Sequence, residues 1–118
     1  MRLFELRKDR LFLLDITESC EKIARYLGGK TFEEFVRDDV LFDAIVRNLQ
    51  NIGEAVRCLP PETRALRPEV QWTRIVGLRH LLVQQYFGVD EEIVWDLASN
   101  RASELLDAVT DILARLPE

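Results

Sequence analysis

The sequence predicts an all-α fold, an antiparallel bundle of four to five helices with up-down topology. Apolar residues recur at steps of three and four along most of the 118 residues, as in helices that bury one face. No segment alternates between apolar and polar residues for long enough to predict a strand. The helix-breaking pairs Gly28-Gly29 and Pro60-Pro61 leave only short connections between the periodic stretches. Since neither a linker nor a repeat divides the chain, residues 1–118 are expected to form one domain.

The first helix is predicted over residues 3–27, where leucines and isoleucines keep the helical period. Gly28-Gly29 supplies the expected stop, because glycine readily adopts the left-handed conformation that ends helices. A short second helix is predicted to begin at Thr31. Glu34 follows three residues later, so the two side chains can form a capping box.

A long helix is predicted to begin at Asp38 or Asp39 and to end before Pro60-Pro61. Its expected apolar side consists of Val40, Leu41, Ala44, Ile45, Leu49, Ile52, Ala55, Val56 and Leu59. The nearly continuous apolar run over 40–46 predicts burial on more than one side, and hence a two-fold symmetric homodimer that pairs through the bundle. A thick core within a single chain is the alternative.

The second half predicts a connection with one helical turn after Pro61, then a helix over residues 72–86 that Gly88 breaks. Asp90 is expected to cap a final helix over 91–116, whose acidic start suits the helix dipole. The side chains expected to face inward from this helix are Ile93, Val94, Leu97, Leu105, Leu106, Val109, Ile112, Leu113 and Leu116.

Composition restricts the possible functions. A net charge of −5 argues against nucleic-acid binding by bulk electrostatics, so any such contact needs a local cluster of arginines. Arginine makes up 13 of the 16 basic residues, which suits bidentate phosphate contacts, although a high-GC or thermophilic codon bias is the favoured explanation. Cys20 and Cys58 lack companion ligands at metal spacing and are expected to be reduced. With neither a signal segment nor a membrane-spanning run, a cytoplasmic protein is expected.

Residues 47–95 carry a specific set of landmarks in order. These are "IGEA" at 52–55, the pattern P-x-x-x-W-x-x-I-x-G-x-R from Pro68 to Arg79, and "YFGVD" at 86–90 followed by "VW". Together they strongly resemble the HepT-like family of the HEPN superfamily.

The resemblance implies a small helical protein that dimerises and is encoded beside a minimal nucleotidyltransferase antitoxin. Active members of the family are metal-independent RNA-cutting toxins, which the antitoxin silences by adenylylating a tyrosine. RNA is therefore the expected substrate and the nucleotidyltransferase the expected partner, with no cofactor, metal, DNA or membrane. The family signature is Arg, four residues, His, one residue, Tyr. It maps here to Arg79 and Tyr86, with Gln84 where the histidine belongs.

Gln84 is the important departure from this signature. A neutral imidazole can accept the proton of the attacking 2′-hydroxyl near neutral pH, and arginine can stabilise charge on the phosphate. Glutamine orients groups but does not titrate. Loss of a general base removes about 10²–10⁴ in rate, so a weak or inactive nuclease is expected. His80 is a poor substitute, because it lies roughly 6 Å along the helix from residue 84.

Helical geometry suggests how the site is completed. Arg79 and Tyr86 face the same way, whereas Gln84 lies about 140° from Arg79 on a continuous helix. The three converge only if the helix loosens before Gly88 or if a second subunit completes the site. A cleft at the dimer interface, lined by both copies of Arg79 and Tyr86, is our structural hypothesis.

Glu54 and Asn51 lie one turn apart and are expected to support this site. Gly53 would allow another helix to approach closely, and an ionised Glu54 would need a partner, either Arg79 or Arg47. For Arg79 alone, a purely structural ion pair with Glu54 is the alternative to catalysis. The aromatic side chains expected in packing, rather than in base stacking, are Trp72, Trp95 and Phe87.

Overall fold

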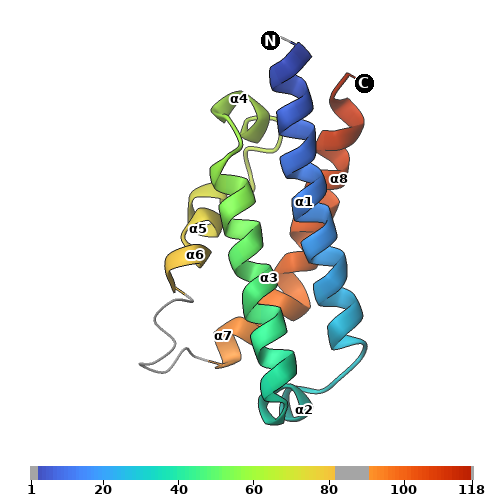
Figure 1. The fold of residues 1–118 in the computed structure, drawn as a ribbon, viewed down its shortest axis with the longest axis vertical. Coiled ribbons are helices and arrows are strands. Elements are labelled where there is room, and N and C mark those ends of the chain that lie inside the picture. The colour runs from blue at the N-terminus through green and yellow to red at the C-terminus, as the bar shows by residue number, and fades with distance from the viewer. Residues whose placement is uncertain (1–2, 82–90, 118) are drawn as a thin grey trace.

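The computed structural model describes residues 3–81 and 91–117, and the side chains of 7–80 and 91–117. These residues form helices and turns without strands, which confirms the all-α prediction. The three long helices α1 (Leu3–Leu27), α3 (Asp39–Arg57) and α8 (Ala102–Arg115) run side by side, with α1 packed against both others (Figure 1). The chain reverses at each end of the molecule, so the expected up-down arrangement is observed (Figure 1).

Shorter elements complete the bundle: α2 (Phe32–Arg37), α4 (Pro61–Arg64), α5 (Trp72–Val76), α6 (Leu78–Leu81), α7 (Glu91–Asp96) and the π-helical turn η2 (Leu97–Arg101). Helices α5 and α6 lie against the side of α3, whereas α7 meets α2 at the lower end of the molecule in Figure 1. The last arm of the bundle is formed by α7, η2 and α8 in succession.

The predicted helix boundaries in the first half are confirmed. Gly28 and Gly29 adopt positive φ angles of 45° and 80° after α1. At α2 the capping box forms as expected, with the Thr31 amide 3.0 Å from Glu34 Oε1 and the Glu34 amide 3.2 Å from Thr31 Oγ1. The Thr31 amide also lowers the pKa of the Glu34 carboxyl. Asp38 caps α3 by accepting a hydrogen bond from the Leu41 amide at 3.0 Å.

The later helices are less continuous than predicted. The helix expected from residue 72 is interrupted at Gly77, where the Gly77 amide bonds the Thr73 carbonyl and the His80 amide bonds the Gly77 carbonyl. The second of these spans only three residues, so the chain tightens there and α6 begins anew. The final helix contains the π-helical turn η2, and it ends at Arg115, one residue before the predicted end.

The core lies among α1, α3 and α8. Its completely buried apolar side chains include Leu13, Ile16, Ile45, Val56, Val94, Val109 and Ile112. Two expected core residues are instead exposed: Val40 to 80% and Ile93 to 48%. The neighbours Leu41 and Val94 are buried, and adjacent helical residues point about 100° apart, so Val40 and Ile93 point away from the core where their neighbours face it.

Both tryptophans that the structure describes pack as predicted, whereas Phe87 lies outside the described residues. The Trp72 ring is buried, and its indole N–H donates to the carbonyls of Arg64 and Arg67, at 3.0 Å each. Trp95 packs against Phe32 and Phe35, with ring centroids 5.9 and 5.4 Å away. Both rings therefore serve packing within the fold.

Both cysteines are free thiols, Cys20 buried and Cys58 half-buried. Burial raises the pKa of the Cys20 thiol to about 12, and the charge of Glu21 adds to the rise. None of the helices in the described ranges is long and apolar enough to cross a membrane.

Candidate functional site

Gly53 brings two backbones together near the C-terminal end of α3. A Cβ atom at this position would lie 3.0 Å from the Ile75 carbonyl oxygen and 3.1 Å from the Arg79 amide nitrogen. Both distances are shorter than ordinary contacts, so any side chain here would push α5 and α6 away from α3. The predicted close approach at Gly53 is therefore confirmed. It places the backbone of Arg79 next to the residue that precedes Glu54.

Glu54 bridges two arginines. Its Oε2 accepts a hydrogen bond from Arg79 Nη1 at 3.0 Å, across 25 residues of sequence. Its Oε1 accepts from Arg57 Nε at 3.1 Å and from Arg57 Nη2 at 2.5 Å. We call Arg57, Glu54 and Arg79 the Glu54 cluster. Of the two partners proposed for Glu54, Arg79 is the one observed, whereas Arg47 is exposed and makes no hydrogen bond to it.

Arg57 is the residue that sequence reasoning missed. Glu54 and Arg57 are three residues apart on one helix, a spacing at which opposite charges commonly pair. The signal was therefore present in the sequence, although the prediction named only Arg79 and Arg47 as partners of Glu54. The hydrogen bond from Arg57 is the main cause that lowers the pKa of the Glu54 carboxyl, with smaller contributions from the charges of Arg57 and Arg79. The same hydrogen bond raises the pKa of Arg57.

Asn51 faces a different environment from Arg79. Together with Glu54 it lines a groove of about 400 Å³ between α1 and α3, whose other charged residues are Asp15, Glu18 and Lys22. Three carboxylates against one ammonium make this groove unfavourable for a phosphate. Glu54 thus stands at a boundary, with an acidic groove on one side and two guanidinium groups on the other.

His80 follows Arg79 on α6 and its side chain is exposed. Gln84 and Tyr86 lie outside the described residues, so the structure brings together only part of the predicted site, namely Arg79 and Glu54. The break at Gly77 changes the premise of a continuous helix from residue 72. The relation of Arg79 to Gln84 and Tyr86 stays a prediction.

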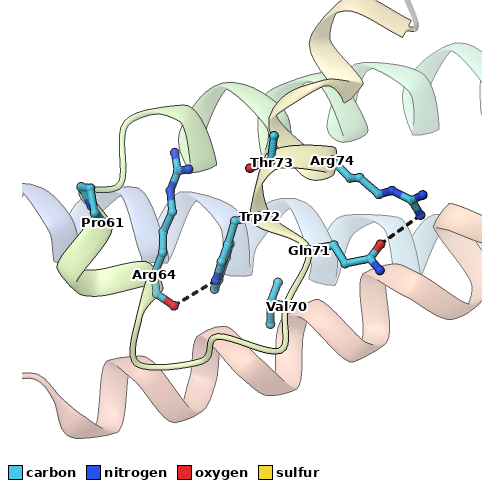
Figure 2. A pocket seen from close by; sticks show the side chains of 7 residues that line it. All are labelled: Pro61, Arg64, Val70, Gln71, Trp72, Thr73 and Arg74. Carbon is cyan, nitrogen blue, oxygen red and sulfur yellow. Dashed lines mark hydrogen bonds between the residues drawn. The ribbon is translucent and has the colours of Figure 1, made fainter.

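A separate pocket lies away from the Glu54 cluster. A depression of about 550 Å³ between α4 and α5 is lined by Pro61, Arg64, Val70, Gln71, Trp72, Thr73 and Arg74 (Figure 2). Several of its polar groups are already engaged, because the Trp72 indole bonds the Arg64 carbonyl and Arg74 bonds Gln71 (Figure 2). Arg64 in addition donates to the Val56 carbonyl at 2.9 Å, near the end of α3. These contacts hold α4 and α5 against α3, so we give the pocket a structural role.

The segment from the end of α3 to α6 is locally cationic. Residues 57–79 contain five arginines and two glutamates, giving a charge of +3 in a chain whose net charge is −5. In the structure two of these arginines, Arg57 and Arg79, share the Glu54 carboxylate, and a local group of arginines is what an acidic protein needs if it is to bind a nucleic acid. Within the described ranges, no three His, Cys, Asp or Glu side chains are grouped as metal ligands.

Comparisons with known proteins agree on one family. The family model described as "Ribonuclease HepT-like" matches residues 16–112. "Putative RNase TTE0752" of Caldanaerobacter subterraneus subsp. tengcongensis is 39% identical over 110 residues, which cover 93% of this chain and 98% of that protein. "Putative RNase MJ0127" of Methanocaldococcus jannaschii is 36% identical over 91% of this chain and 89% of its own length.

A relative whose printed name is "Probable ribonuclease HepT", from Thermococcus cleftensis, is 35% identical over 75% of this chain and 81% of its own length. No solved structure matches the chain. The family match covers the Glu54 cluster, all of α3 and parts of α1 and α8, and the first of these relatives aligns along 93% of the chain. The chain therefore belongs to the HepT-like ribonuclease family.

Proposed function

We propose that this protein is the toxin-type component of a toxin–antitoxin module, built on an RNA-cleavage site that lacks its usual histidine. The observation that carries the proposal is the position of Arg79 in a chain of a ribonuclease family. Arg79 lies on α6, which packs directly against α3 at Gly53, and its guanidinium donates a hydrogen bond to Glu54 of α3. A guanidinium fixed in this way is suited to stabilising the charge that develops on a phosphate during cleavage.

In the proposed reaction the 2′-oxygen of a ribose attacks the adjacent phosphorus, and the bond to the 5′-oxygen of the next nucleotide breaks. Arg79 stabilises the extra negative charge on the phosphate oxygens. Removing one such donor typically reduces the rate by about 10²–10³. A second group must accept the proton from the 2′-hydroxyl, and Gln84 cannot do so because an amide does not titrate in this range.

The native chain is therefore expected to cleave RNA slowly or not at all, and Gln84→His is the test. If the site is a decayed nuclease, this variant gains cleavage of a labelled single-stranded RNA, by about 10²–10⁴ over the native chain. Arg79→Ala added to Gln84→His should remove the gain. His80→Ala in the native chain shows whether His80 supplies any residual activity.

A non-catalytic role is the alternative that Gln84 itself favours. In that case the protein binds RNA, a nucleotide or its nucleotidyltransferase partner without cutting. Neither the native chain nor Gln84→His would then cleave RNA, while Arg79→Ala would abolish binding. Cleavage by the native chain would exclude this alternative, whereas cleavage by Gln84→His alone would identify the site as a decayed nuclease.

Tyr86 is the proposed acceptor for regulation by the nucleotidyltransferase. Its phenolic oxygen would attack the α-phosphorus of ATP on the partner enzyme, forming a phosphodiester and releasing pyrophosphate. Incubation with the enzyme encoded beside it and ATP should add one adenylyl group to the intact mass, and Tyr86→Phe should prevent the addition. Addition that persists in Tyr86→Phe would assign the modification to another residue.

A homodimer with a composite cleft is part of the proposal. Leu11 and Leu14 support it, because they lie three residues apart on α1 and are 61% and 46% exposed. Exposed leucines on one helix face are suited to contact with a second copy. Light scattering after gel filtration should give twice the chain mass, and Leu11→Asp should shift the mass toward that of one chain. A monomeric native protein would contradict this part.

A further inference from the structure

Arg57 is an exposed cationic side chain that has no role in the proposed cleavage reaction. Its side chain is 50% exposed and bonds Glu54 through Nε and Nη2. Among the described residues, its Nη1 group has no hydrogen-bond partner. Arg79 uses only Nη1 on the same carboxylate, so its Nε and Nη2 are likewise without a partner in that part of the chain. One carboxylate therefore holds two guanidinium groups that each keep an unused donor edge.

The Glu54 cluster is not the only contact that holds α6 on α3. Helix α6 is already seated on α3 by the backbone contact at Gly53, and the carboxylate between the arginines is 52% exposed. Ion pairs that are exposed to this degree contribute little to stability, because water and salt screen them. The structural alternative to ligand binding is that Arg57 stabilises α3, because a positive charge in the last turn of a helix interacts favourably with the helix dipole.

The charge of the surroundings favours an anionic ligand. Two guanidinium groups and one carboxylate give the Glu54 cluster a net charge of +1. The groove between α1 and α3, on the other side of Glu54, is acidic. A polyanion is therefore expected to approach over Arg57 and Arg79 rather than along α1.

From this geometry we infer that Arg57 is a second phosphate-binding residue, which Glu54 aligns with Arg79 so that each arginine takes a phosphate of a single-stranded RNA backbone. This inference rests on the proposed function, because it assigns RNA as the ligand of the same site. Arg57 binds and orients the strand, and it takes no part in bond breaking.

The test is equilibrium binding of a fluorescently labelled, mixed-sequence RNA with 2′-O-methyl riboses, measured at several salt concentrations. Such an RNA lacks the attacking hydroxyl, so binding is separated from cleavage. Arg57→Ala should lower the affinity at low salt by roughly fivefold to tenfold. It should also reduce the slope of log affinity against log salt by about 0.7, the value for one phosphate contact on a single strand. Arg57→Lys should retain most of the slope, since it keeps the charge.

Arg101→Ala is the matched control. Arg101 is also exposed and also pairs with a glutamate three residues away, Glu104, but it lies outside the segment 57–79. Its loss should leave the affinity and the slope unchanged. Equal losses in Arg57→Ala and Arg101→Ala would overturn the inference, as would the absence of any effect in Arg57→Ala. Failure of the native chain to bind this RNA would overturn it too.

Parallel cleavage assays with unmodified RNA keep the two proposals distinguishable. If neither the native chain nor Gln84→His cleaves RNA while the salt slope still changes in Arg57→Ala, the proposed cleavage fails and the assignment of Arg57 stands. If cleavage is observed and binding is the same with and without Arg57, the proposed cleavage stands and the assignment of Arg57 fails.

Discussion

Two clusters in this protein each pair one carboxylate with two arginines, but their surroundings differ. In the Glu54 cluster one carboxylate bridges Arg57 and Arg79. In a second cluster, which we call the Asp111 cluster, Asp111 Oδ2 lies 3.2 Å from Arg67 Nη1 and 2.9 Å from Arg115 Nη2. Both carboxylates therefore hold two arginines, one from their own helix and one from a distant segment.

The second bonds of the arginines distinguish the clusters. Arg115 also donates to the Leu66 carbonyl at 3.1 Å, and Arg67 also bonds Glu69 at 2.6 Å. The Asp111 cluster thus fastens the connection after α4 to α8. In the Glu54 cluster the donors that remain have no second acceptor among the described residues, and the helices are held by Gly53 instead. Ion pairs of one kind therefore serve structure where each arginine also bonds a second acceptor, and they leave room for a ligand where the shared carboxylate is the arginines' only acceptor among the described residues.

The largest expected effect comes from Gly53→Ala. The added Cβ would lie 3.0 and 3.1 Å from backbone atoms of α5 and α6, which have little freedom to move. Overpacking of this kind costs about 1–3 kcal/mol, and the better helix propensity of alanine offsets at most about 1 kcal/mol of it. Urea denaturation should show a net loss of stability of about 1–2 kcal/mol.

Gly77→Ala is the control for this prediction. A Cβ there would meet the Arg74 carbonyl at 3.2 Å, within the same stretch of chain, so a smaller loss is expected. A Gly53→Ala protein as stable as the native one would show that α6 can shift away from α3. In that case Gly53 would not be what places Arg79.

The next effect separates the two clusters. Asp111→Asn should lower Tm by roughly 2–4 °C, because it weakens the attachment of the connection to α8. It should leave RNA cleavage unchanged. Glu54→Gln should leave Tm nearly unchanged but slow cleavage by roughly tenfold, since Arg79 loses the charge that orients it. Binding should not weaken, because the site becomes more positive.

These measurements require thermal denaturation of both variants, and single-turnover cleavage in whichever form cuts RNA, the native chain or Gln84→His. A large fall in Tm for Glu54→Gln with unchanged cleavage would reverse the comparison. The Glu54 cluster would then be a structural fastening like the Asp111 cluster.

The smallest effect is a shift in the titration of Glu54. Its pKa in the folded protein lies below the ordinary value of 4.5, chiefly because of the hydrogen bond from Arg57. The stabilising interaction is therefore present above pH 4.5 and is lost as the pH falls through the lower folded-state value. Carboxyl ¹³C NMR should give a midpoint below 4.5 in the native chain. Arg57→Ala should raise this midpoint more than Arg79→Ala does, and the opposite order would contradict the observed bonding.

Local rules in the sequence predicted most of the fold. The capping box at Thr31 and the cap at Asp38 depend on residues three apart, and the stop at Gly28-Gly29 on the backbone freedom of glycine alone. The interruption at Gly77 and the π-helical turn Leu97–Arg101 were not predicted, because both leave the hydrophobic period nearly intact. The exposure of Val40 and Ile93 was missed because composition does not say which of two adjacent apolar residues faces the core.

By itself, the sequence determined the helical class, the ends of the early helices and membership of the HepT-like family, since these follow from residue types at fixed local spacings. Only the tertiary structure decided that Gly53 touches the backbone at Arg79 and that Glu54 holds Arg57 and Arg79 at once. The physical reason is distance along the chain. Glu54 and Arg79 are separated by 25 residues, and no local period encodes which helix faces will meet.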